Sequence, residues 1–464
     1  MNSLDPGCEI DGFRLGELIH AGSMAFIYRL VGPRGPLPLI MKIPRLGVGE
    51  RAVNVTGFEV CRMVLGALGQ GPHHPTLVAY GDVETTPYLV IQHIEGSRLS
   101  DFLSRVPLPP TEIARLGSAV AIALHDLHRR DVVHLDLKPT NIMFRQNGEA
   151  MLIDFGLARH GHLPDLLAEE LRFPVGNWVY MAPEQTLGVR CDPRSDIYAL
   201  GAILYELATG RLPFGRPRSI SELKRRLHAD PVPPRAIAPM TPEWLQEVIL
   251  RCLEVDARKR YDSAEQVAFD LANPAAVVLT ERASRRRRSR WLTRARRRLQ
   301  ALRFVPAPCP PLSRESPMSK VAMVAIAPNE SNEMLLDALR RAARKVLAAE
   351  PACRIACVTV VPPAAGLTGE GEEGTATGRQ IKRLVELRHW ARPLELPEDR
   401  LTCHVLESDK PAAALVDYAK MNDVDQMLIG APRGGPVRLL AGVCTQLVAE
   451  APCSVSVVRA RSQT

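Results

Sequence analysis

The sequence predicts two folded regions of different classes. One is an α+β region over residues 10–275, and the other is an α/β region with an open parallel sheet over residues 319–461. Residues 276–318, which separate them, are rich first in arginine and then in proline, as is typical of a linker. From residue 319 onward, short apolar runs alternate with amphipathic stretches. A chain of 464 residues has room for two or three domains with cores of their own.

The α/β region can be divided into elements from its hydrophobic pattern. Apolar runs at 321–327, 355–361, 401–406, 426–429 and 454–458 predict buried strands. The stretches 332–349, 378–390, 410–421 and 437–450 predict helices between them. Regular alternation of strand and helix indicates a parallel sheet with helices on both faces.

The net charge of +8 is concentrated in one stretch. Residues 281–303 hold eleven arginines and one acid, so the rest of the chain is slightly acidic. A basic, weakly amphipathic helix here would bind anionic lipid or nucleic acid. A solvated, disordered tether explains the same composition equally well, and both interpretations stay open.

The sequence favours a cytoplasmic protein, with peripheral membrane contact through the arginine stretch as an open alternative. No apolar run reaches the ~18–20 residues of a membrane span, and the first residues lack a signal-peptide pattern. The ten cysteines are scattered and form no CxxC pair. We therefore expect free thiols in a reducing compartment.

Two short motifs in the first region have the residue types that phosphoryl transfer needs. They are HLDLKPTN at 134–141 and DFG at 154–156. The reaction needs a carboxylate that orients and deprotonates the attacking hydroxyl, and oxygen ligands that hold Mg²⁺ on the phosphates. Asp136 suits the first role, and Asn141 and Asp154 suit the second as metal ligands.

A lysine upstream of these motifs suits the binding of phosphate. Lys42 ends a short apolar run and could reach the α- and β-phosphates of a nucleotide if an acid held it in place. Glu59, in the helical stretch 58–68, is the expected partner. The sequence therefore predicts an ion pair between Lys42 and Glu59.

Three further motifs follow in order: YMAPE at 180–184, SDIYALG at 195–201 and RKRY at 258–261. With them, residues 12–272 resemble a protein kinase domain of the bacterial Ser/Thr type. The resemblance implies the bilobal α+β protein kinase fold, with ATP and Mg²⁺ as cofactors. It also implies that Asp196 braces the catalytic loop and that Arg260 pairs with Glu184.

The same resemblance implies further nucleotide contacts. The adenine of ATP would bind the backbone of a hinge at Gln92 and Ile94, with the Ile91 side chain behind it. Lys138, two residues after Asp136, is usual in Ser/Thr kinases and favours protein hydroxyls as acceptors. Asp136, Lys138 and Lys42 are thus the catalytic candidates.

The glycine-rich loop that kinases close over the phosphates is degraded here. Residues 19–27 align with it, and Ile19, Gly22 and Ile27 would contact the nucleotide. Of its three glycines only Gly22 remains, because His20 and Ala25 replace the other two. His20 would lower ATP affinity or simply point to solvent, and we favour the second.

Both halves of the usual phosphorylation switch are missing. Leu135 replaces the arginine that would bind a phosphorylated activation loop, and residues 157–181 contain no Ser or Thr and a single Tyr, Tyr180. We therefore expect activation without phosphorylation of this loop. Its order would come from its own acids (Asp165, Glu169 and Glu170) or from the second domain. Asn177 replaces a usual threonine, and its side chain could still donate to Asp136.

The second region contains DQMLIG at 425–430 and APCSVSVV at 451–458, and it resembles the universal stress protein family. ATP-binding members end the first strand with Asp, where this chain has Ala327. The spacing from Gly434 to Gly442 is too short for their phosphate loop, and Val443 replaces a hydroxyl residue. We predict a regulatory or dimerisation module that does not bind ATP, so a homodimer through it is possible.

The leading hypothesis is an active Ser/Thr protein kinase that phosphorylates protein hydroxyls and is regulated by its second domain. A catalytically silent scaffold with the same motifs is the first alternative. A protein that binds a membrane surface or nucleic acid through the arginine stretch is the second.

Overall fold

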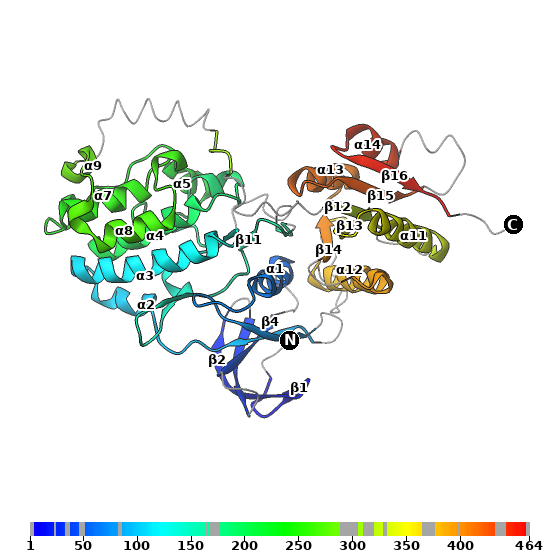
Figure 1. The fold of residues 1–464 in the computed structure, drawn as a ribbon, viewed down its shortest axis with the longest axis horizontal. Coiled ribbons are helices and arrows are strands. Elements are labelled where there is room, and N and C mark those ends of the chain that lie inside the picture. The colour runs from blue at the N-terminus through cyan, green and yellow to red at the C-terminus, as the bar shows by residue number, and fades with distance from the viewer. Residues whose placement is uncertain are drawn as a thin grey trace.

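The computed structural model describes residues 4–460 apart from 23–24, 33–37, 46–51, 82–85, 164, 168–175, 288–304, 310–319, 328–331, 364–375, 397–399 and 432–441. It contains two lobes of a first region and a separate open-sheet region beside them (Figure 1). The predicted fold classes of both regions are confirmed.

The N-terminal lobe is a six-stranded antiparallel sheet with one helix. Its strand order is β1-β2-β3-β4-β6-β5, and helix α1 (Ala52–Leu68) packs beside it. The strands are β1 (Glu9–Ile10), β2 (Phe13–Ala21), β3 (Ala25–Val31), β4 (Leu39–Pro44), β5 (Leu77–Gly81) and β6 (Tyr88–Gln92). Along β4, Leu39, Met41 and Ile43 are buried in the core of this sheet. Because side chains alternate along a strand, Lys42 points to the opposite face.

The C-terminal lobe is mainly helical. Its helices are α2 (Leu99–Phe102), α3 (Pro110–His128), α4 (Arg194–Thr209), α5 (Ile220–Leu223), α6 (Pro234–Ile237), α7 (Glu243–Cys252), α8 (Ala264–Ala272) and α9 (Glu281–Ser284). Helix α4 is buried on nearly every side, as its apolar sequence requires. A Cβ atom on Gly201 would lie 2.4 Å from Cys252, so this glycine lets α4 and α7 pack closely.

Two small sheets position the motifs at 134–141 and 154–156 between these helices. Their strands are β7 (Ser97–Arg98), β9 (Ile142–Phe144) and β10 (Ala150–Leu152) in one sheet, and β8 (Val132–Val133) with β11 (Arg159–His160) in the other. Residues 134–141 therefore leave β8 and enter β9, and residues 154–156 follow β10. The pairing brings the two motifs to one edge of the lobe.

The C-terminal region is a five-stranded parallel sheet of order β14-β13-β12-β15-β16. The strands are β12 (Val321–Ala325), β13 (Arg354–Val361), β14 (Leu401–Glu407), β15 (Gln426–Gly430) and β16 (Ser454–Val458). Helices α11 (Glu333–Ala349) and α12 (Ala376–Ala391) cover one face, and α13 (Pro411–Met421) and α14 (Val443–Glu450) the other. All five strands and all four helices were predicted to within a few residues, except that the predicted start of the last helix lies outside the described residues.

The expectation of free thiols was wrong at one pair. Cys191 of the kinase-like region forms a disulfide with Cys309 of the linker. The two residues are 118 positions apart, so no local spacing could indicate the bond. Within the described parts of the chain, no helix is both long and apolar enough to cross a membrane.

Candidate active site

The catalytic loop holds three of the predicted site residues in direct contact. The Lys138 ammonium donates to Asp136 Oδ2 at 2.5 Å, and the Asn141 amide donates to the same oxygen at 3.1 Å. Asn141 also donates to the Asp136 backbone carbonyl at 3.0 Å. Asp136 and Asn141 are buried. These bonds fix the rotamer of the Asp136 carboxylate.

Asp196, at the start of α4, braces this loop as the resemblance implied. Its carboxylate accepts from the backbone N–H groups of His134 (2.8 Å) and Leu135 (2.9 Å) and contacts the His128 ring at 2.9 Å. Burial would raise the pKa of Asp196, but the hydrogen bond from His128 lowers it below its usual value. Leu135 has a φ of 62°, a strained backbone for a branched residue, and the bond from its N–H helps to hold it.

Lys42 of the N-terminal lobe and Asp154 of the C-terminal lobe form an ion pair. Lys42 Nζ lies 2.7 Å from Asp154 Oδ1. The lysine charge lowers the pKa of Asp154 to about 2. Burial would lower the pKa of Lys42, but the Asp154 charge raises it above its ordinary value. Both groups therefore stay charged at neutral pH.

The residue after Asp154 anchors this segment in the core. Phe155 is fully buried and packs between the rings of His134 and His74, with ring centres 5.2 Å and 6.4 Å away. His134 also contacts the Ile153 carbonyl at 3.1 Å. His134 is thus a packing residue.

The predicted ion pair between Lys42 and Glu59 was wrong for this conformation. Both residues are described, and Lys42 pairs with Asp154 instead. Glu59, from α1, lies 3.1 Å from the Arg62 guanidinium and 2.6 Å from that of Arg388 in the C-terminal region. The acid that the sequence predicts as the partner of Lys42 is therefore engaged elsewhere.

The described residues of the degraded glycine-rich loop belong to the end of β2, Gly22 and the start of β3. The Gly22 N–H donates to the Ala25 carbonyl at 3.0 Å, and Arg45 donates to the Gly22 carbonyl at 3.0 Å. His20 is exposed, in agreement with the favoured interpretation, and its ring lies over Gly22. Ile19 and Ile27 lie on these two strands.

The hinge follows β6. The N–H groups of Gln92 and His93 donate to the Thr76 and Pro38 carbonyls at 2.9 and 2.8 Å. Ile94 is buried. These bonds fix the backbone at the hinge, where the resemblance implies that adenine binds. The N–H groups of Gln92 and His93 are already used in these bonds.

The described part of the activation segment is held by a buried charge pair. Asp165 lies 2.7 Å from Arg190, which also donates to the Leu157 carbonyl at 3.2 Å. Glu169 and Glu170 lie outside the described residues. Sequence reasoning missed Arg190, because no motif marks it and its partner is 25 residues away.

Tyr180 and Asn177, near the end of this segment, are both held by hydrogen bonds. The Tyr180 hydroxyl is buried and donates to Glu206 at 2.6 Å. Burial, with the neighbouring Glu206, raises its pKa. Asn177 contacts Asp136 through its backbone N–H at 3.2 Å, and its side chain accepts from Val179, so the predicted side-chain donation was wrong.

The predicted pair of Glu184 and Arg260 is confirmed. The guanidinium makes two bonds to the carboxylate, at 2.6 and 2.7 Å, and both side chains are almost fully buried. Ser195 donates to the same carboxylate at 2.7 Å. Burial would raise the pKa of Glu184, but Arg260 lowers it.

Two protein families match parts of this chain. The protein kinase domain family matches residues 68–270, and the universal stress protein family matches residues 318–459. This chain carries a protein kinase domain followed by a universal stress protein domain. The kinase match begins after Lys42 and Glu59, so the N-terminal lobe is the less typical part.

Curated proteins that are similar to this chain include bacterial Ser/Thr kinases. The chain is 30% identical over 287 residues to the serine/threonine-protein kinase PknB of Mycolicibacterium smegmatis, with 58% of this chain and 45% of that protein covered. It is 34% identical over 282 residues to the serine/threonine-protein kinase Pkn1 of Myxococcus xanthus, and this match covers 59% of this chain and 37% of that protein. The chain thus spans less than half the length of these two relatives. The crystal structure of the Mycobacterium tuberculosis PknI kinase domain matches with a TM-score of 0.46 at 21% identity, over 58% of this chain and 99% of that one.

The universal stress protein domain has an apolar cavity at the carboxyl ends of its strands. Ala327, Gly430 and Val443 line it, together with Leu335 and Val358. Ala327, where ATP-binding members carry Asp, thus presents a methyl group to the cavity. Val443, where they carry a hydroxyl residue, presents an isopropyl group. Gly434 lies outside the described residues.

Proposed function

We propose that this chain is an active Ser/Thr protein kinase that transfers the γ-phosphate of Mg-ATP to protein Ser or Thr hydroxyls. The observation that carries the proposal is the arrangement around Asp136. Its carboxylate is bound by Lys138 and Asn141, and Lys42 and Asp154 form an ion pair between the two lobes. The similarity to bacterial Ser/Thr kinases supports this assignment.

Each residue has a role in this proposal. Asp136 accepts the proton of the substrate hydroxyl, and Lys138 holds that carboxylate and faces the charge that develops near it. Lys42 binds the α- and β-phosphates once it has exchanged Asp154 for Glu59. Ile19, Gly22, Ile27, Gln92 and Ile94 would surround the nucleotide.

The metal-binding roles of Asp154 and Asn141 fit their geometry. The Asn141 amide nitrogen faces Asp136, which turns its oxygen the other way, and Asp154 is ionised at neutral pH. Carboxylate and amide oxygens are suitable ligands for Mg²⁺. When bound, the ion would neutralise charge on the phosphate oxygens.

Comparison of the wild type with Asp136→Asn tests catalysis. The full chain should phosphorylate itself or a basic protein acceptor with Mg-ATP, and Asp136→Asn should lower the rate by about 10²–10⁴-fold. Equal rates in the two proteins would contradict the proposal. No transfer by either, despite Mg-ATP binding, would favour the silent scaffold.

We also propose that activity does not depend on phosphorylation of the activation loop. The Tyr180 hydroxyl is buried against Glu206, and the Asp165–Arg190 pair supplies order without a phosphate. Mass spectrometry of active protein should find residues 157–181 unmodified. A stoichiometric phosphate there that activity requires would refute this proposal.

A further inference from the structure

Helix α1 has a buried polar face that needs a partner. Thr56 and Glu59 are three residues apart, so they lie on the same side of the helix. Both are buried, with exposed fractions of 7% and 5%. A carboxylate so removed from water is costly unless a cation neutralises it.

The cation comes from the universal stress protein domain. Arg388, on α12, places its guanidinium 2.6 Å from Glu59 Oε1, and the two side chains are 19% and 7% exposed. Arg62, on α1 itself, occupies the other carboxylate oxygen at 3.1 Å. Helices α1 and α12 pack against each other here, with β14 close by (Figure 1).

Apolar side chains lie beside the Glu59 carboxylate of this ion pair. Leu166 of the activation segment, with Leu384 and Val405 of the second domain, surrounds the same small gap as Thr56 and Glu59. Burial of the Glu59 carboxylate lowers the local dielectric and weakens salt screening, so the attraction of Arg388 for Glu59 is stronger than at an exposed surface.

The universal stress protein domain also makes hydrogen bonds to the activation segment. The Asp165 N–H donates to the side-chain oxygen of Asn422 at 2.8 Å. The guanidinium of Arg354, a buried residue, donates to the His162 carbonyl. The contact therefore covers the two elements whose positions decide whether a kinase is active, namely α1 and the activation segment.

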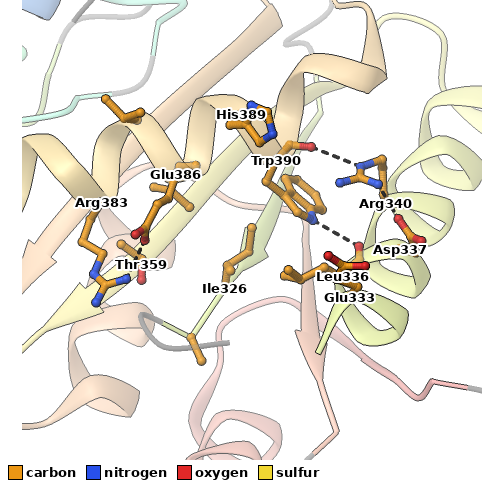
Figure 2. Close-up of a pocket in the computed structure, with 13 residues that line it drawn as sticks. Ile326, Glu333, Leu336, Asp337, Arg340, Thr359, Arg383, Glu386, His389 and Trp390 are labelled. Atoms are coloured by element: carbon orange, nitrogen blue, oxygen red, sulfur yellow. Dashed lines mark hydrogen bonds and ion pairs between the residues drawn. The ribbon is translucent and has the colours of Figure 1, made fainter. Parts of the chain in front are cut away.

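The packing of its own domain fixes the helix that carries Arg388. The Trp390 indole N–H donates to the Leu336 carbonyl of α11 at 3.1 Å, and Arg340 of α11 donates to the Trp390 carbonyl at 3.1 Å (Figure 2). These bonds join α11 and α12 beside a cavity of about 840 Å³. Arg388 is thus presented to Glu59 by a braced helix.

We propose that the universal stress protein domain is a docked inhibitor of the kinase domain, and that Arg388 inhibits by keeping the Glu59 carboxylate from Lys42. This inference rests on the proposed kinase activity. Phosphoryl transfer needs the pair between the lysine and the α1 acid, and this pair cannot form while Arg388 and Arg62 hold Glu59 and Asp154 holds Lys42. Undocking of α12 releases Glu59 and starts activity.

Substitutions in the full chain test the proposal. Arg388→Ala and Arg388→Glu should raise kcat/KM for a protein acceptor by about 5- to 150-fold, the usual range of coupling between sites. Lys382→Ala removes the same charge from an exposed position on the same helix and should change nothing. Asn422→Ala removes the hydrogen bond to Asp165 and should also raise kcat/KM. Because this residue is distant in sequence from Arg388, a rise in both variants would show that a local folding defect at position 388 is not the cause.

Hydrogen exchange of the same proteins provides a readout independent of catalysis. Exchange should rise in α1 and in residues 157–166 for Arg388→Glu and stay unchanged for Lys382→Ala. Unchanged exchange or unchanged kcat/KM in an otherwise active Arg388→Glu protein would overturn the inference. Increased exchange without transfer in any variant would support the docked contact and refute the proposed kinase function instead.

Discussion

Replacement of Arg260 by alanine should destabilise the kinase domain far more than replacement of its neighbour Arg258. Arg260 makes two bonds to Glu184 and also donates to the Glu254 and Arg194 carbonyls, at 2.8 and 2.9 Å. Its side chain has no solvent exposure. Arg260→Ala therefore leaves the Glu184 carboxylate charged, buried and without its guanidinium.

The cost follows from that burial. Breaking a buried pair by removal of one partner typically costs about 3–5 kcal/mol. For a domain of this size, about 2–4 °C of Tm is lost per kcal/mol, so Tm should fall by about 6–20 °C. Calorimetry or circular dichroism of the full chain would measure the shift of the kinase transition.

Arg258 is a matched control two residues away. It pairs with Asp256 at 3.0 Å, but its side chain is 65% exposed, and such surface pairs contribute little. Arg258→Ala should leave Tm nearly unchanged. If the two variants melt together, the argument from burial is refuted. The double variant Glu184→Leu with Arg260→Met should recover part of the loss, since it leaves no buried charge behind.

Three other properties can be predicted. Burial lowers the pKa of His404 to about 4, and the nearby Asp165 charge opposes this only in part. The free energy of unfolding should therefore fall by up to about 3 kcal/mol as pH falls from 6.5 to 4. Urea titrations should show that this free energy depends less on pH for His404→Leu than for the wild type, and parallel pH profiles would contradict the assignment. Equilibrium binding of Mg-ATP to the full chain should saturate at one nucleotide per chain, because the second domain presents Ala327 and Val443 to its cavity; a second site of micromolar affinity would refute this. Alkylation of the unfolded, unreduced chain should modify eight cysteines and all ten only after reduction, since Cys191 and Cys309 are joined; ten modified cysteines without a reductant would show that the bond is absent.

Much of the fold could be predicted because its signals are local. Strands β13 and β15 of the second domain are buried on both faces over most of their length, so they stand out as continuous apolar runs between amphipathic helices. The pair of Glu184 and Arg260 could also be predicted, although 76 residues separate its members, because each lies in a motif of its own.

The partner of Glu59 could not be predicted. Arg388 lies in another domain, more than 300 residues away, in a helix where a charged residue normally faces solvent. Whether Glu59 meets Lys42 or Arg388 depends on how two domains pack, and a motif describes only one of them. The disulfide of Cys191 is a similar case, since its partner is in the linker.

That disulfide has a consequence for how the two domains meet. It attaches the chain to the kinase domain at Cys309, so only ten residues separate this anchor from Lys320, where the second domain begins. A segment of this length spans at most about 40 Å. Tethers that short keep the effective concentration of one partner near the other in the millimolar range. A contact too weak to join two free molecules is therefore enough to keep α12 on α1, and a modest competitor is enough to displace it.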